Sequence, residues 1–266
     1  MSLEVFELEL VGGATERRYR SARPEVDEMP WGSVDPSVYP KDLLAVAQRA
    51  WTTMAFQEHR TGAACAATLQ SLIQARAPLD LISIATHFPL DELVHAELCS
   101  RVAMSFGGGA TIEHDPAEMV PEVGSPDDDP LLKASCQVVA FFCVGETMSV
   151  PLLHGSWKAA THPLTRAVLK SIVDDEADHG TFGWAYLDWA LPHLGKEDRA
   201  ALGATADDAI RGMRASWKEI LERPDAPDYP IGDFGWMENE AYVSLAERSL
   251  EKLVLKPFRE RGIPCS

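Results

Sequence analysis

The sequence predicts an all-α protein in which four long helices are followed by two further helices. Apolar residues recur at helical spacing over most of the chain, and alternating, strand-like patterns are nearly absent after residue 12. Segments rich in proline and glycine separate the periodic stretches. The chain has 266 residues, 46 % of them hydrophobic, which is enough for one domain with a full core.

Residues 1–39 differ from this pattern and are expected to form an extended N-terminal arm. Apolar residues alternate with glutamates between residues 5 and 10, which indicates one short strand or an extended segment. Paired glycines at 12–13, and frequent prolines and glycines over 24–40, favour a chain that wraps around the rest without packing as a unit.

The helical segments divide into a bundle over residues 40–192 and a C-terminal part over residues 193–266 that packs on it within one domain. Pro89 lies inside the second segment, so we expect either a kink or a true helix start near Leu90. A Pro-, Asp- and Gly-rich stretch at 224–235 separates the last two helices. The predicted helices, in chain order, cover residues 40–76, 79–105, 130–160, 162–191, 197–222 and 236–257.

A long loop is predicted between the second and third helices. Residues 107–129 begin with three glycines and go on to several prolines and three consecutive aspartates, which a continuing helix would not tolerate. A loop of this length can cross from one end of a bundle to the other, so that it joins the two helices lengthwise.

The charge and composition of the chain limit its partners. Its 41 acidic and 24 basic residues give a formal net charge of −17, and such a surface repels nucleic acids and anionic membranes. The most apolar stretch, residues 138–144, is far shorter than the ~20 residues of a membrane span. The N-terminus lacks the features of a secretory signal, and the five cysteines form no C-x-x-C pair. We therefore expect a cytoplasmic protein with reduced thiols and with neither a nucleic-acid nor a membrane partner.

Two copies of one short motif lie on the second and fourth predicted helices. Residues 91–95 and 175–179 both read Asp-Glu-x-x-His, and they contain the only Glu-x-x-His matches in the chain. A glutamate and a histidine three residues apart lie on one face of a helix, so each pair can point at the same metal ion. One such match is expected by chance, whereas two copies on two amphipathic helices indicate a metal site.

Each of the other two bundle helices offers one carboxylate. Glu58 precedes Glu92 by 34 residues and Glu146 precedes Glu176 by 30, which places the members of each pair at similar heights in an antiparallel hairpin. Glu146 lies in a nearly all-apolar segment, where a lone carboxylate is costly to ionise unless a cation pairs with it. The chain therefore contains two related hairpins, each with a glutamate followed by Asp-Glu-x-x-His.

This pattern resembles the ferritin-like di-iron carboxylate superfamily. The resemblance covers residues 40–192 and implies a ferritin-like four-helix bundle with two iron ions, or a manganese–iron pair, and with O2 as co-substrate. It also implies six residues that ligate the metals and carry the catalysis: Glu58, Glu92, His95, Glu146, Glu176 and His179.

The resemblance implies individual roles as well. Glu92 and Glu176 would bridge the two metals, the other two glutamates would each bind one metal, and each histidine would bind one metal through an imidazole nitrogen. Asp91 and Asp175 stand where members of the superfamily often hold an aspartate that orients a ligating histidine on another helix.

Two functions stay open, because the same ligands serve several reactions within this superfamily. The first is an O2-activating oxidase or oxygenase that acts on a small organic substrate. The arm, the long loop and the two extra helices favour it, since storage ferritins are nearly bare bundles and these additions could form a pocket. Small residues near the ligands could leave such a space: Gly62, Cys65, Ala66, Ser149 and Gly180. The alternative is a ferroxidase or another iron-handling protein without an organic substrate.

Arylamine N-oxygenases, tRNA hydroxylases and aldehyde-deformylating oxygenases resemble this ligand pattern. Ile172 stands where the N-oxygenases carry a further histidine, and the net charge of −17 disfavours an RNA substrate. An oxygenase also needs electrons, so we expect a reductase or ferredoxin partner whose basic patch matches the acidic surface. A homodimer is compatible with the sequence.

Overall fold

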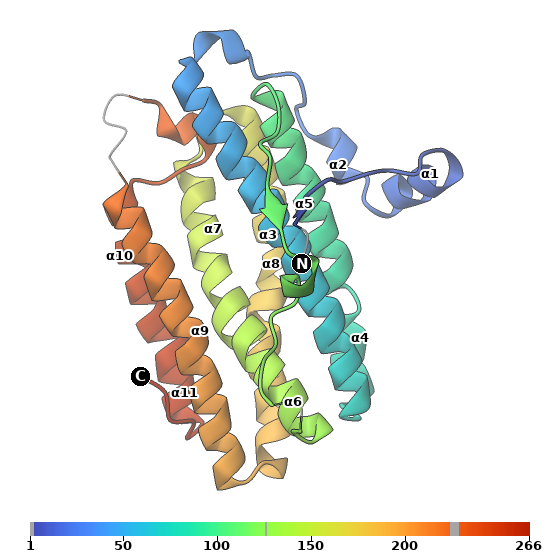
Figure 1. Cartoon of the computed structure of the whole chain (residues 1–266), viewed down its shortest axis with the longest axis vertical. Coiled ribbons are helices and arrows are strands. Elements are labelled where there is room, and N and C mark those ends of the chain that lie inside the picture. Colours follow the sequence, from blue (N-terminus) through green and yellow to red (C-terminus); the bar gives the residue numbers. More distant parts are fainter. Residues whose placement is uncertain (1–2, 126, 224–228) are drawn as a thin grey trace.

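The computed structural model describes residues 3–125, 127–223 and 229–266. It confirms the prediction of an all-α protein, since the regular elements in these ranges are helices apart from two strands of two residues each. The long helices run roughly along one axis of the molecule (Figure 1).

Two helical hairpins form the centre of the molecule. Their elements are α3 (Lys41–Gln74), α4 (Leu79–Ala85), α5 (Phe88–Ser105), α6 (Pro130–Gln137), η3 (Val138–Glu146), α7 (Thr147–Ala159) and α8 (Pro163–Ala190). α6, η3 and α7 form one continuous helix, which packs along α8, while α3 packs along α5. The hairpins meet where α5 contacts α8 and where α3 contacts α6 and η3.

Pro89 marks a helix start and not a kink. The predicted second helix consists of the short α4 and the longer α5, which begins at Phe88 with Pro89 in its first turn. A proline costs no backbone hydrogen bond at this position, because the first N–H groups of a helix have no intrahelical partner.

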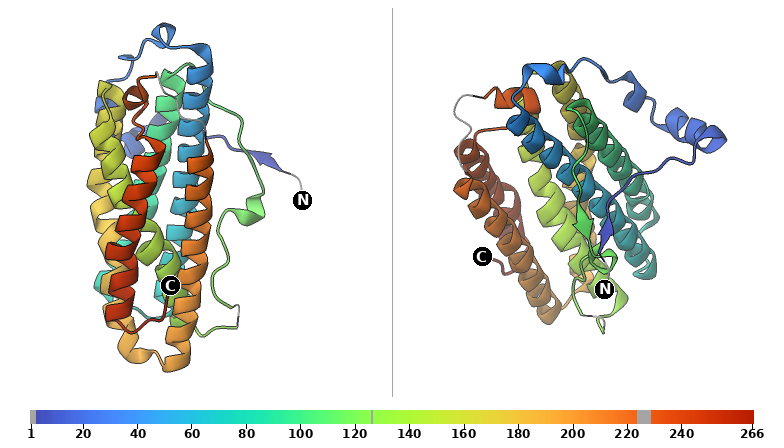
Figure 2. Two further views of the ribbon diagram at one scale, coloured as in Figure 1. Left: turned by 90° about the vertical axis from the view of Figure 1, so that its left-hand side faces the viewer. Right: turned by 45° about the horizontal axis from the view of Figure 1, so that its top comes forward.

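The segment between α5 and α6 runs along the outside of the bundle and connects its two ends (Figures 1 and 2). It carries the strand β2 (Glu113–His114) and the short 3-10 helix η2 (Pro116–Glu118), while Pro126 lies outside the described residues. β1 (Glu4–Val5) pairs with β2 in antiparallel orientation. Of the stretch 5–10, predicted as a short strand or an extended segment, only Val5 lies in this strand, which ties the start of the described chain to the crossing segment.

The N-terminal arm is not fully extended, which corrects the prediction for residues 1–39. It contains α1 (Gly13–Ala22), α2 (Glu25–Glu28) and the 3-10 helix η1 (Pro36–Val38). Helical periodicity did not reveal α1, because this helix buries no residue and carries no apolar stripe. α2 anchors the arm through Val26, which is fully buried.

η3 is a π-helical stretch within the third helix of the bundle. It is nine residues long and ends at Glu146. In a π-helical turn, the backbone hydrogen bonds join residues five apart instead of four. Such turns are rare and often lie at functional sites. Immediately after η3, the hydroxyl of Thr147 donates to the carbonyl of Phe142 at 3.0 Å, so a side chain helps to satisfy the altered backbone.

The C-terminal helices cover the outer face of α6, η3 and α7. Their elements are η4 (Leu191–His193), α9 (Lys196–Glu222), η5 (Ile231–Phe234), α10 (Asn239–Ser249), η6 (Leu250–Leu255) and α11 (Lys256–Glu260). α9 packs against α6 and η3, and α10 packs against α7. Of the stretch predicted to separate these helices, residues 224–228 lie outside the described residues.

One helix among the described residues is long and apolar enough to cross a membrane by length and composition. It covers Pro130–Ala159, has a mean hydropathy of 1.6 in its most apolar window, and is 56 % buried over that window. It also carries the buried carboxyl of Glu146. Core helices of water-soluble bundles pass the same test, so length and composition alone are weak evidence for a membrane span.

Candidate metal centre

The structure brings all six predicted ligands together inside the bundle, where they form what we call the six-residue cluster. Its members are Glu58 on α3, Glu92 and His95 on α5, Glu146 at the end of η3, and Glu176 and His179 on α8. Their ligand atoms fall into two groups of four residues, and within each group the atoms lie within 4.8 Å of one another. Both groups contain Glu92 and Glu176, so these two glutamates are the residues that the two candidate metal positions would share.

The two imidazole rings present the same nitrogen to the carboxylates. Nδ1 of His95 lies 3.5 Å from Glu176 Oε1 and 3.9 Å from Glu92 Oε2. Nδ1 of His179 lies 3.0 Å from Glu92 Oε1 and 3.7 Å from Glu176 Oε2. Each ring therefore faces both shared glutamates, and Nδ1 is the atom through which each histidine would bind a metal.

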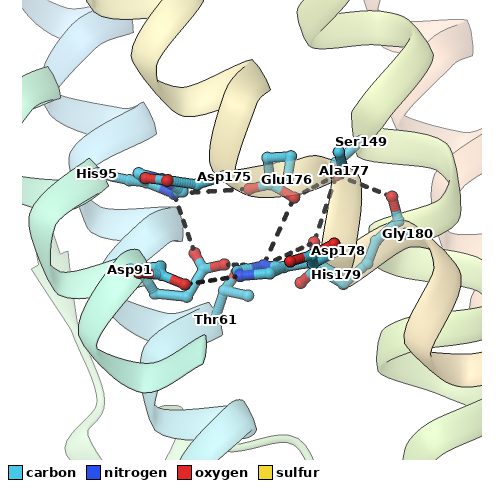
Figure 3. Close-up of polar contacts among 12 residues, drawn as sticks. Thr61, Asp91, His95, Ser149, Asp175, Glu176, Ala177, Asp178, His179 and Gly180 are labelled. Carbon is cyan, nitrogen blue, oxygen red and sulfur yellow. Dashed lines mark hydrogen bonds and ion pairs between the residues drawn. The ribbon is translucent and has the colours of Figure 1, made fainter. Parts of the chain in front are cut away.

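The outer nitrogens of the two rings contact aspartates on the opposite helix. Nε2 of His95 lies 3.1 Å from Asp175 Oδ2, and Nε2 of His179 lies 3.4 Å from Asp91 Oδ2 (Figure 3). A carboxylate at Nε2 favours the tautomer that carries its proton there, which leaves the lone pair on Nδ1 directed at the cluster. The Asp of each Asp-Glu-x-x-His motif thus orients the histidine of the other motif.

Arg23 of the N-terminal arm bridges these two aspartates, and no pattern in the sequence indicated this contact. Its Nη1 donates to Asp91 Oδ1 at 2.5 Å and its Nη2 donates to Asp175 Oδ2 at 2.6 Å, while its Nε donates to Glu25. Burial opposes ionisation of Asp175, but the bonds to His95 and Arg23 outweigh it and lower the pKa of this carboxyl. One guanidinium therefore contacts both histidine-orienting aspartates, and it favours the charged form of Asp175.

Burial disfavours the charged form of three carboxyl groups of the cluster, those of Glu92, Glu146 and Glu176. Burial, and after it the neighbouring carboxylates, raise the pKa of Glu92 and Glu176 well above the usual range. Burial likewise raises the pKa of Glu146 to about 7. A pair of divalent cations would offset this unfavourable environment, because it would neutralise the four carboxylates of the cluster.

Several buried polar atoms of the cluster lack a hydrogen-bond partner among the described residues. They are both carboxylate oxygens of Glu92, Nδ1 of His95 and Nδ1 of His179. A buried polar atom without a partner costs about 1–3 kcal/mol, and here four such atoms face one small space. This arrangement fits metal binding, since oxygen and imidazole donors are the ligands that iron and manganese accept.

Ser149 is a further polar contact of the cluster. Its Oγ lies 3.1 Å from Glu176 Oε2 and 3.3 Å from Glu146 Oε2. It follows Glu146 by three residues, so both side chains lie on one face of the helix. Sequence reasoning named Ser149 only as a small residue that leaves space, and its hydroxyl contact depends on the approach of α8.

A cavity of about 340 Å³ lies beside the cluster. Glu58, Glu146 and Glu176 form part of its lining together with Ser149, and Pro121 of the crossing segment also lines it. The expectation that the long loop helps to form a pocket is thus met at one residue. Three carboxylates of the cluster are accessible from this cavity.

Of the five small residues predicted to leave space, only Ser149 lines this cavity. Gly62 and Gly180 instead permit close helix packing. A Cβ atom on Gly62 would lie 3.2 Å from Glu92 Cβ, and one on Gly180 would lie 2.7 Å from Val150 Cγ2. Ile172 is fully buried in the apolar core and offers no ligand atom.

No protein-family model matches this chain, and no curated protein matches it. The case for a metal centre therefore rests on the geometry of the cluster.

Proposed function

We propose that this protein is a ferritin-like dimetal-carboxylate protein and an O2-activating di-iron oxidase or oxygenase of a small organic substrate. The observation that carries the proposal is the cavity of about 340 Å³ that reaches three carboxylates of the cluster. A ligand site of this kind places a substrate directly beside the metals, which iron storage does not require.

The arrangement of the helices supports the ferritin-like part of the proposal. Two hairpins, α3–α5 and α6–α8, are joined by a segment that crosses the length of the bundle (Figure 1). Each hairpin supplies one Glu and one Glu-x-x-His, the ligand pattern of di-iron carboxylate proteins of this type. Manganese in place of one iron is compatible with the same oxygen and nitrogen donors.

A reduced pair of irons, when bound, would supply two electrons to O2. The protein would fix the positions of both histidines through Asp91 and Asp175, and Ser149 would hold Glu176 by a hydrogen bond. The apolar residues around the cluster would exclude bulk water from the reaction.

We also propose that the protein works in the cytoplasm with a soluble electron donor, a reductase or a ferredoxin. The net charge of −17 supports a donor with a basic docking surface, because opposite charges speed the encounter of two proteins. The rate of reduction by such a donor should fall as the salt concentration rises.

The test is an anaerobic titration with Fe(II), followed by exposure to O2 with and without candidate substrates. We expect two irons per chain, oxygen consumption, and a transient absorbance that decays faster when a substrate is present. Glu146→Ala should remain folded but retain fewer than two irons, because it removes one ligand, whereas Glu219→Ala on the exposed side of α9 should bind iron like the native protein.

Two outcomes would contradict the proposal. Iron uptake far beyond two ions per chain, with no effect of any substrate, would favour the ferroxidase alternative. Retention of two irons by Glu146→Ala would show that the ligand assignment is wrong.

A further inference from the structure

Among the described residues that line the cavity beside the cluster, Arg60 is the one cationic side chain. It lies on α3, where residues 57, 60, 61 and 64 line the cavity at helical spacing and so form one face of the helix. Glu58 lies on the same helix two residues before Arg60 and also reaches the cavity. The cavity therefore has a cation on the wall that also carries a metal ligand.

The guanidinium of Arg60 has only neutral contacts among the described residues. Its Nη1 lies 3.3 Å from Gln57 Oε1, and its Nη2 lies 3.3 Å from the carbonyl oxygen of Glu118. By contrast, Arg20, Arg23 and Arg261 all pair with carboxylates. Arg166 and Arg199 likewise donate only to backbone carbonyl oxygens among the described residues, but of these three arginines only Arg60 lines the cavity.

The rest of the cavity is suited to an apolar body. Ala64, Ala140, Phe141 and Leu153 form the apolar part of its walls, Gln57 and Thr61 add polar groups, and the cluster lies at one side. With two divalent cations bound, the four carboxylates of the cluster are neutralised, which leaves the charge of Arg60 uncompensated in the cavity. A guanidinium pairs best with a carboxylate, through two parallel hydrogen bonds.

We propose that the ligand of this cavity is a small monocarboxylate with an apolar body, and that Arg60 binds its carboxylate. This inference rests on the proposed function, since it names the substrate class of the same site. The carboxylate would lie at Arg60 and the apolar part would extend along Phe141 and Leu153 toward Glu146, which places the far end of the molecule nearest the metals.

The test is equilibrium binding by calorimetry to the full chain loaded with Zn(II), which carries out no redox chemistry. The probes are pairs with one apolar body and different head groups: hexanoate and 1-hexanol, and 4-methylbenzoate and 4-methylbenzyl alcohol. We expect at least one carboxylate to bind about 10–100-fold more tightly than its alcohol, because a hydrogen bond to a charged group is worth that factor.

Arg60→Gln should abolish this preference and leave the affinity for the alcohol unchanged. A merely structural effect of the substitution would instead lower the affinity for both probes equally. Arg49→Gln, an equal change of charge at an exposed position of α3 that does not line the cavity, should keep the preference. The inference is overturned if no pair shows a carboxylate preference, or if Arg60→Gln retains it, since the carboxylate would then bind the metals.

The same probes are measured on metal-free protein, where the preference for the carboxylate should still depend on Arg60. Failure to bind two irons or to consume O2 contradicts the proposed function. If the native protein shows no preference for the carboxylate, either with Zn(II) or without metal, the role of Arg60 is contradicted while the proposed function is not.

Discussion

At the scale of single residues, Arg23 connects three parts of the chain that lie far apart in sequence. Its planar guanidinium reaches Asp91 and Asp175 at once, and each of these aspartates contacts one histidine of the cluster. The fixed fork of an arginine suits this contact, whereas a lysine offers one point charge. The N-terminal arm is thereby coupled to the orientation of both Nδ1 atoms.

We predict that Arg23→Gln weakens metal binding by about 10–100-fold, the usual effect of removing an outer partner of a ligating histidine. Competition with a chelator for Co(II) would measure the affinity, and the Co(II) absorption spectrum would report a change in ligand geometry. Arg18→Gln, at an exposed position of α1, should leave both unchanged. An affinity equal to that of the native protein would show that the arm does not support the site.

At the scale of elements, the close approach of α8 to η3 positions Glu146 opposite Glu176. Gly183 makes this approach feasible, since a Cβ atom there would lie 2.7 Å from Cys143 Sγ and 2.8 Å from the Cys143 backbone nitrogen. The π-helical stretch ends at Glu146, and the hydroxyl of Thr147 beside it accepts a hydrogen bond from Trp184 Nε1 at 3.1 Å. The local shape of this helix is thus tied to α8 on both sides of the ligand.

Two glycine-to-alanine changes should therefore have opposite effects. Gly183→Ala should lower the free energy of unfolding by about 1–3 kcal/mol, because the methyl group overpacks the contact between α8 and η3. Gly212→Ala on α9 should raise it by about 0.5–1 kcal/mol, since nothing lies within 4 Å of its Cβ position and alanine is the better helix former. Urea unfolding measures both, and equal effects of the two changes would refute the packing argument.

At the scale of the whole molecule, the buried carboxyls link the stability of the metal-free protein to pH. The pKa of Glu146 rises from 4.5 to about 7 on folding, so the folded protein holds a proton that the unfolded chain releases in this range. Protons bound more tightly by the folded state stabilise it at low pH, and this stability is lost as the pH rises through the folded pKa. The pKa values of Glu92 and Glu176 are raised in the same direction.

We predict that, between about pH 4.5 and 7, these groups lower the free energy of unfolding of metal-free protein as the pH rises. Glu146 alone would contribute on the order of 3 kcal/mol. Urea unfolding in a chelator at several pH values would measure the trend. Glu146→Gln should make the trend less steep, because the amide does not titrate while Glu92 and Glu176 still do. Saturating Zn(II) should raise the stability at neutral pH by binding the folded state. Equal slopes for native protein and Glu146→Gln would contradict the pKa assignment.

The sequence by itself determined the helices of the bundle and which six residues meet at its centre. Helical periodicity places the elements, and the separations between Glu58 and Glu92 and between Glu146 and Glu176 encode the height of each ligand within a hairpin. Helical periodicity is a local property, and the heights of the ligands depend only on the geometry of a hairpin. Both can therefore be predicted from one amino-acid sequence.

The tertiary structure alone decided the features that depend on contacts between distant segments. Arg23 lies 68 residues from Asp91 and 152 from Asp175, and no pattern in the chain marks that encounter. Hydrophobic periodicity does not predict the helix α1, because none of its residues is buried. The cavity that joins Arg60 to the cluster lies where α3, η3, α7, α8 and the crossing segment meet, because its shape follows from how these elements pack and not from any one of them.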